Sequence, residues 1–154
     1  TVLHHFGSRD GLLAAVADRA LSTLRIGALS KLTDAPGLGA VERLLEAVAA
    51  QMADGGRART LMQLTLAGAG GGVAGLGLEP LIDAVHAVRV RVWVDEGRKK
   101  PSREDTQFTV LMTAMSLLSL SVLTEGEGAR GLDVARFRAW LAKLVHRQLH
   151  DGLG

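Results

Sequence analysis

Cysteine is absent from the 154-residue chain, and aromatic residues make up only 3% of it. A chain without cysteine has no disulfide framework, no thiolate metal site and no thiol nucleophile. A large excess of positive charge is also missing, because the formal net charge is only +2, and this argues against the dense basic coat of a ribosomal tail. No signal-peptide pattern is visible, so we expect a cytoplasmic protein.

The residues that dominate instead are alanine, leucine, valine and glycine, and 47% of the chain is hydrophobic. Alanine and leucine favour helix, and a chain of this length can hold one substantial core. Hydrophobic residues recur at helical spacing in a series of segments: 8–31, 40–53, 57–67, from Pro80 onwards, 103–124 and 133–150. The glycine-rich stretch 68–77 predicts a loop or a badly frayed helix end. We therefore predict an all-α helical bundle.

Residues 88–94 permit a second interpretation, because their valines alternate with other side chains as in a strand. Upstream, Gly70–Gly75 matches the dinucleotide-binding pattern G-x-G-x-x-G, and Asp95 follows at about the distance of a ribose ligand. A small nucleotide-binding oxidoreductase is therefore an alternative function, and it requires a strand at 88–94. Against it, Pro80 interrupts the helix that should begin directly on the last glycines.

The helix expected at 103–124 has no charged residue between Asp105 and Glu125. An uncharged span of this length approaches that of a transmembrane helix. Its hydroxyl side chains and Gln107 make it a poor membrane-spanning segment. We expect a helix that is buried on several faces at once, and no membrane partner.

The first twelve residues read T-V-L-H-H-F-G-S-R-D-G-L and carry the most specific pattern in the chain. A short run containing two histidines ends at Gly7, after which Ser8 can cap a new helix. Asp10 lies in the first turn of that helix, where the dipole favours negative charge. A helix, a turn and a second helix with histidine and arginine at the junction suit contact with phosphate.

This pattern resembles the end of the recognition helix in the TetR family of transcriptional regulators, T-[LV]-Y-x-H-F-x-[SN]-K-[ED]-x-L. The resemblance implies contacts with double-stranded operator DNA by the following residues: Thr1, Leu3, His4, His5 and Arg9. Leu3 replaces the usual tyrosine and lacks its hydroxyl, whereas Arg9 keeps the charge of the usual lysine. It also implies that the chain begins within the helix-turn-helix, with residues 1–31 as its end and connecting helix.

Residues 32–154 would then form a ligand-binding and dimerisation domain. In TetR-like proteins the middle helices enclose an apolar effector cavity, and pocket candidates here are Met62, Leu66, His86, Trp93, Met112, Met115 and Ser116. The last two helices of that family pair with those of a second copy. The corresponding interface candidates are Ala114, Ser119, Ser121, Phe137, Trp140, Leu141 and Leu144. The implied function is a homodimeric repressor that a small, largely apolar effector releases from its operator.

Catalytic and metal chemistry have little support in the sequence. His146 and His150 lie four residues apart, but they fall near the end of a helix, where cations suit the dipole. The uncharged helix supplies none of the carboxylates that a di-metal bundle needs. Neither Gly-x-Ser-x-Gly nor a phosphate-binding Walker loop is present. We expect no enzyme, no metal and no cofactor, and keep a helical dimerisation module without ligand as a further alternative.

Overall fold

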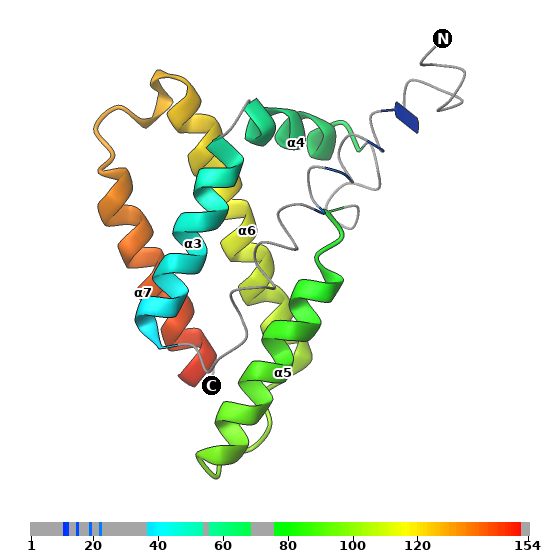
Figure 1. Cartoon of the computed structure of the whole chain (residues 1–154), viewed down its shortest axis with the longest axis vertical. Coiled ribbons are helices and arrows are strands. Elements are labelled where there is room, and N and C mark those ends of the chain that lie inside the picture. Colours follow the sequence, from blue (N-terminus) through cyan, green and yellow to red (C-terminus); the bar gives the residue numbers. More distant parts are fainter. Residues whose placement is uncertain are drawn as a thin grey trace.

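The computed structural model of the chain describes residues 11–12, 15, 19, 22, 37–53, 56–68 and 76–151, except for the side chain of Glu127. The elements in these ranges are all helical (Figure 1): α3 (Leu38–Ala53), α4 (Arg57–Leu66), α5 (Glu79–Asp95), α6 (Arg103–Glu125), the short 3-10 helix η4 (Glu127–Ala129) and α7 (Val134–Asp151). No strand occurs among the described residues. The predicted all-α class is confirmed for this part of the chain.

The helices begin and end where local sequence signals place them. Ser102 caps α6, and its hydroxyl accepts a hydrogen bond from the backbone N–H of Asp105 at 3.5 Å. Asp133 caps α7 by accepting from the N–H of Arg136 at 3.0 Å. Pro80 lies in the first turn of α5, where its missing N–H costs nothing. These residues satisfy or remove donors that helix ends otherwise leave without a partner.

Residues 88–94 are part of α5, so the strand interpretation is wrong. The buried residues of α5, Ile82, Val85, Val88 and Arg89, recur at helical spacing and form one face. Alternating valines satisfied the strand pattern only because valine is common on both sides of this helix. α5 runs on to Asp95, and Gly97 with φ +70° follows the helix end. The glycine stretch Gly70–Gly75 lies outside the described residues.

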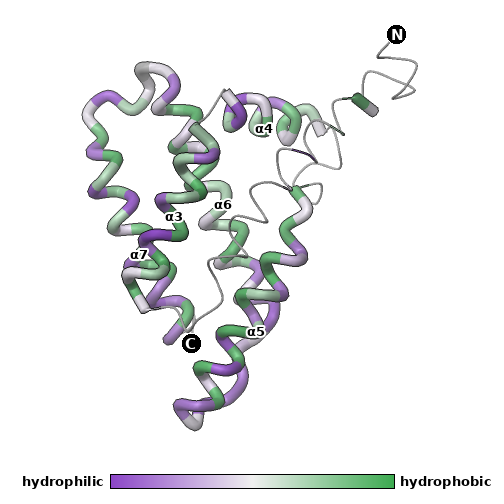
Figure 2. The backbone as a smooth tube through the Cα atoms, in the orientation of Figure 1, coloured by the Kyte–Doolittle hydropathy of each residue, from purple (hydrophilic) through white to green (hydrophobic). Residues whose placement is uncertain are grey.

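The core lies where α3 packs against both α6 and α7. Figure 1 shows α3 in front of α6 and beside α7, with α5 on the other side of α6 and α4 near its end. Figure 2 shows hydrophobic and hydrophilic positions alternating along α7, as expected of a helix with one buried face. Members of the core include Val41, Leu45, Ala58, Leu61, Ile82, Leu117, Leu118, Leu141 and Ala142.

Helix α6 is the centre of the bundle, because it contacts α3, α4, α5 and α7. Its length and composition would also allow it to cross a membrane, with a mean hydropathy of 1.5, and it is the one such helix in the described ranges. The same properties are expected of a helix surrounded by others, and 39% of that apolar window is buried within the chain. The remaining part of this apolar stretch of α6 is not buried by the chain itself, so it can contact another molecule.

Candidate functional site

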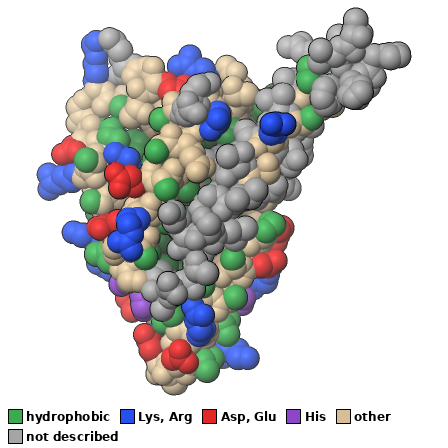
Figure 3. All heavy atoms as spheres, viewed as in Figure 1, with side chains coloured by type: hydrophobic (Ala, Val, Ile, Leu, Met, Phe, Trp, Pro, Cys, Tyr) green, Lys and Arg blue, Asp and Glu red, His purple; other side chains and the backbone are tan. Residues whose placement is uncertain are grey.

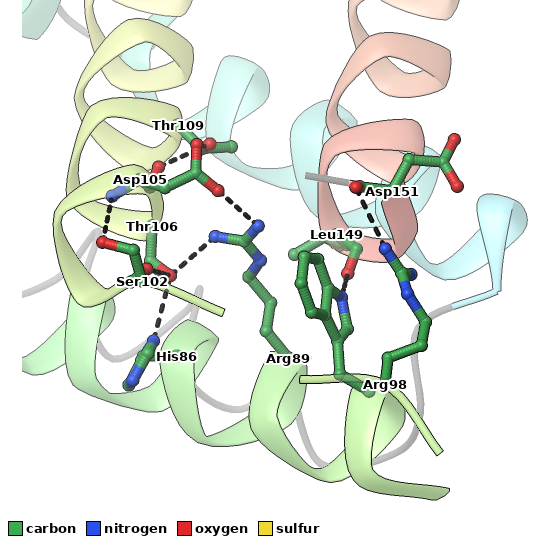
Figure 4. A network of polar contacts seen from close by, with 10 residues as sticks. His86, Arg89, Arg98, Ser102, Asp105, Thr106, Thr109, Leu149 and Asp151 are labelled. Atoms are coloured by element: carbon green, nitrogen blue, oxygen red, sulfur yellow. Dashed lines mark hydrogen bonds and ion pairs between the residues drawn. The ribbon is translucent and has the colours of Figure 1, made fainter. Parts of the chain in front are cut away.

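A polar network joins α5 to the first turn of α6, and its centre is the fully buried Arg89 (Figure 4). One terminal nitrogen, Nη2, forms an ion pair with Asp105 Oδ2 at 2.5 Å. The other, Nη1, donates to Thr106 Oγ1 at 2.7 Å. A guanidinium is always charged in proteins, so burial requires a counter-ion, and Asp105 supplies it.

The position of Arg89 follows from the helical period. It lies four residues after Val85 and seven after Ile82, on the buried face of α5. Its partners Asp105 and Thr106 are held in the first turn of α6 next to the cap residue Ser102. Arg89 Nε has no hydrogen-bond partner among the described residues, so the network leaves one buried donor unsatisfied.

His86 extends the network towards the surface. Its Nδ1 lies 3.0 Å from Thr106 Oγ1, the same oxygen that accepts from Arg89. Burial lowers the pKa of His86 below the usual 6.5, and the positive charges of Arg89 and Arg103 lower it further, against the opposing effect of Asp83. His86 is therefore neutral near pH 7, with one nitrogen as donor and the other as acceptor.

A second group of contacts joins the end of α5 to the end of α7. Trp93 Nε1 donates to the carbonyl oxygen of Leu149 at 2.8 Å. The guanidinium of Arg98 stacks over the Trp93 ring, 3.9 Å from its centroid, and donates to the carbonyl oxygen of Asp151 at 3.0 Å. The last carbonyls of a helix have no partner within it, so Trp93 and Arg98 cap α7 from a distant segment.

The predicted pocket residues are only partly brought together. His86 and Trp93 both adjoin Arg89, whose guanidinium lies 5.4 Å from the Trp93 ring centroid. Leu66 is 79% exposed at the end of α4, and Met112 is 39% exposed on α6. The remaining candidates are partly buried, and two of them pack against the core: Met62, Met115 and Ser116.

The predicted interface residues fall into two groups. Ser121 and Leu141 are buried within the single chain, so their side chains have almost no surface to offer to a partner. The others are exposed or partly exposed: Ala114, Ser119, Phe137, Trp140 and Leu144. Trp140 is 56% exposed, and its ring centroid lies 5.9 Å from that of Phe137.

The side of α6 opposite its buried residues is a largely apolar face, formed by the exposed Phe108, Met112 and Leu123 and the partly exposed Ser119. These residues follow one another at helical spacing, and Phe108 and Leu123 are 54% and 44% exposed. No charged side chain occurs on α6 between Asp105 and Glu125. Charged residues normally cover the outward face of a surface helix, so this face is suited to contact with another apolar surface.

The proposed DNA contacts, Thr1, Leu3, His4, His5 and Arg9, lie outside the described residues. Within the described ranges, no group of three or more His, Asp or Glu side chains is arranged to hold a metal ion. The rings of His146 and His150 lie 4.5 Å apart. Burial and the neighbouring His150 lower the pKa of His146.

Comparisons with protein-family models, with curated proteins and with solved structures find no match to this chain. The sequence interpretation missed Arg89, Asp105 and Thr106, which form the most buried polar contacts described here. The sequence does indicate Arg89, because it continues the apolar stripe of Ile82 and Val85 on α5, and a buried charge at that position requires a partner of opposite charge.

Proposed function

We propose that the chain is the regulatory and dimerisation part of a ligand-responsive DNA-binding transcriptional regulator, similar to the TetR family and acting as a repressor. The pattern at residues 1–12 supports DNA contact. Residues 32–154 supply the body, whose described parts are helical. The observation that carries the proposal is the apolar face of α6, because a regulator of this kind needs a second copy to hold two DNA-reading helices at a fixed spacing.

Pairing of two copies accounts for this face. In a symmetric dimer the same surface contributes from both chains, so the face must complement itself. A face without charge does this at no electrostatic cost. Phe137 and Leu144 on the neighbouring helix α7 add apolar area, and aromatic side chains dominate the energetics of interfaces.

The effector would act through α5, which contacts both α6 and α7. A ligand shifts an equilibrium only by its different affinity for the two states, here the DNA-binding and released spacings of the dimer. His86 offers a neutral imidazole, and Trp93 an aromatic ring, for a small apolar molecule with one polar group. Both residues belong to contacts that fix α5 relative to α6 and α7.

Dimerisation is tested with Met112→Glu, which places a charge in the middle of the apolar face. Sedimentation velocity should show a dimer for the wild type and a monomer for the variant, because an unpaired charge in a desolvated interface costs several kcal/mol. Gln63→Glu is the matched control, since Gln63 is exposed on α4 and the charge change is the same. A monomeric wild type, or an equal response of the two variants, would contradict the proposal.

DNA binding is tested with Arg9→Ala and a duplex that the protein selects from a random pool. Loss of one phosphate contact should reduce the slope of log affinity against log salt by about 1. An unchanged slope means that Arg9 contacts no phosphate. The alternative, a helical dimerisation module without ligand, predicts a dimer in sedimentation velocity, no binding of duplex DNA and no change in melting temperature with small apolar molecules.

A further inference from the structure

The outer face of α7 carries a straight line of three cations and one exposed tryptophan: Arg136, Trp140, Lys143 and Arg147. Their spacing of four, three and four residues places them above one another on one side of the helix. All four are exposed. Figure 3 shows Lys and Arg side chains projecting at the edge of the molecule where α7 lies.

These cations lack acidic partners within the described part of the chain. Elsewhere, Arg89, Arg98 and Arg103 each pair with a carboxylate. No such pair involves the cations on the outer face of α7. Of the two carboxylates nearest in the sequence, that of Asp133 is engaged as the helix cap, and that of Asp151, four residues after Arg147, is in none of these ion pairs.

Helix stability does not explain the line. Arg136 is in the first turn of α7, where the positive end of the helix dipole disfavours a cation. Trp140 keeps 56% of its surface exposed, so it contributes little to the core. Its position beside the Phe137 ring supports a flat aromatic surface among the cations. Arg136 and the exposed Trp140 are therefore unfavourable for the chain alone, and the three cations have no acidic partner in the described part of it. Such a line of cations is suited to binding an external polyanion.

We propose that the outer face of α7 binds single-stranded nucleic acid without sequence preference. Arg136, Lys143 and Arg147 would contact phosphates, and a base would stack on Trp140, the combination by which single strands are bound. The line extends over about 16 Å of helix, enough for several nucleotides. This surface is separate from residues 1–12, so it goes beyond the proposed reading of duplex DNA.

Other occupants fit this face less well. A second copy of this line, packed directly on it, would bring like charges together across a symmetry axis. A helix that binds a lipid surface needs its apolar side free, whereas Leu141 and Leu149 on that side of α7 are buried in the core. Single strands need only cations and an exposed ring.

The experiment measures fluorescence anisotropy of a labelled 15-nucleotide oligo(dT) with the whole chain at several salt concentrations. The variant R136Q/K143Q/R147Q should reduce the slope of log affinity against log salt by about 2, because each phosphate contact on a single strand contributes about 0.7. The matched control R91Q/K99Q/K100Q removes the same charge from exposed positions on α5 and the segment after it, and should leave the slope unchanged.

Trp140→Leu should weaken oligo(dT) binding about tenfold and remove the quenching of tryptophan fluorescence that a stacked base produces. The proposal is overturned if the wild type does not bind oligo(dT), if both triple variants respond equally, or if only anionic lipid vesicles bind through the three cations. Arg9→Ala should leave oligo(dT) binding unchanged. The two nucleic-acid proposals can therefore fail separately.

Discussion

Replacing Asp105 by asparagine should destabilise the fold more than most single substitutions. The side chain keeps its shape but loses the charge that balances the fully buried Arg89. Removing one partner of a buried pair typically costs about 3–5 kcal/mol, because the other charge is left without compensation. Asp105 itself is 18% exposed, so water will relieve part of this cost and we expect about 3 kcal/mol.

The loss is measured by urea denaturation followed by circular dichroism at 222 nm, with the free energy of unfolding extrapolated to water. The control is Arg103→Gln, which removes the exposed pairs with Glu79 and Asp83 and should cost less than about 1 kcal/mol. A loss for Asp105→Asn as small as that of the control would refute the reasoning. Arg89→Met combined with Asp105→Leu should recover most of the stability, because no charge then remains buried.

Two further outcomes are expected. The pKa values of His86 and His146 lie below 6.5 in the folded chain, so the unfolded chain binds protons more readily. The free energy of unfolding should therefore fall as the pH decreases below 6.5. The double variant His86→Gln/His146→Gln should show a smaller fall between pH 7.5 and 5.5. Gly97→Ala should lower the free energy of unfolding, measured by urea denaturation, by about 1 kcal/mol, because φ at Gly97 is +70° although a Cβ there would meet open space. The control Gly126→Ala should change it very little, because φ is −117° and the surroundings are equally open.

The helices were predictable because local signals and hydrophobic period agreed. The sequence predicts helices at 40–53, 57–67 and 103–124, and α3, α4 and α6 coincide with them to within two residues at each end. Ser102 and Asp133 are predictable as caps, since a short polar side chain before an apolar run is typical of a helix N-terminus. Residues 88–94 were ambiguous because valine suits both helix faces and strands.

Tertiary polar contacts were not predictable in the same way. Arg98 donates to the carbonyl oxygen of Asp151, 53 positions away, and no local pattern in the sequence indicates this contact. Periodicity reports which side of a helix is buried and not which helix covers it. The same limit explains why Leu141 was assigned to an interface: its apolar character is equally suited to the core, where it lies.

The chain contains only two tryptophans, and they occupy opposite environments. Trp93 is partly buried, donates to Leu149 and is covered by a guanidinium, whereas Trp140 is exposed to water. Their emission maxima should therefore differ, with Trp140 to the red. Unlabelled protein thus carries two optical reporters, one for separation of α5 from the end of α7 and one for any molecule that settles on the outside of α7.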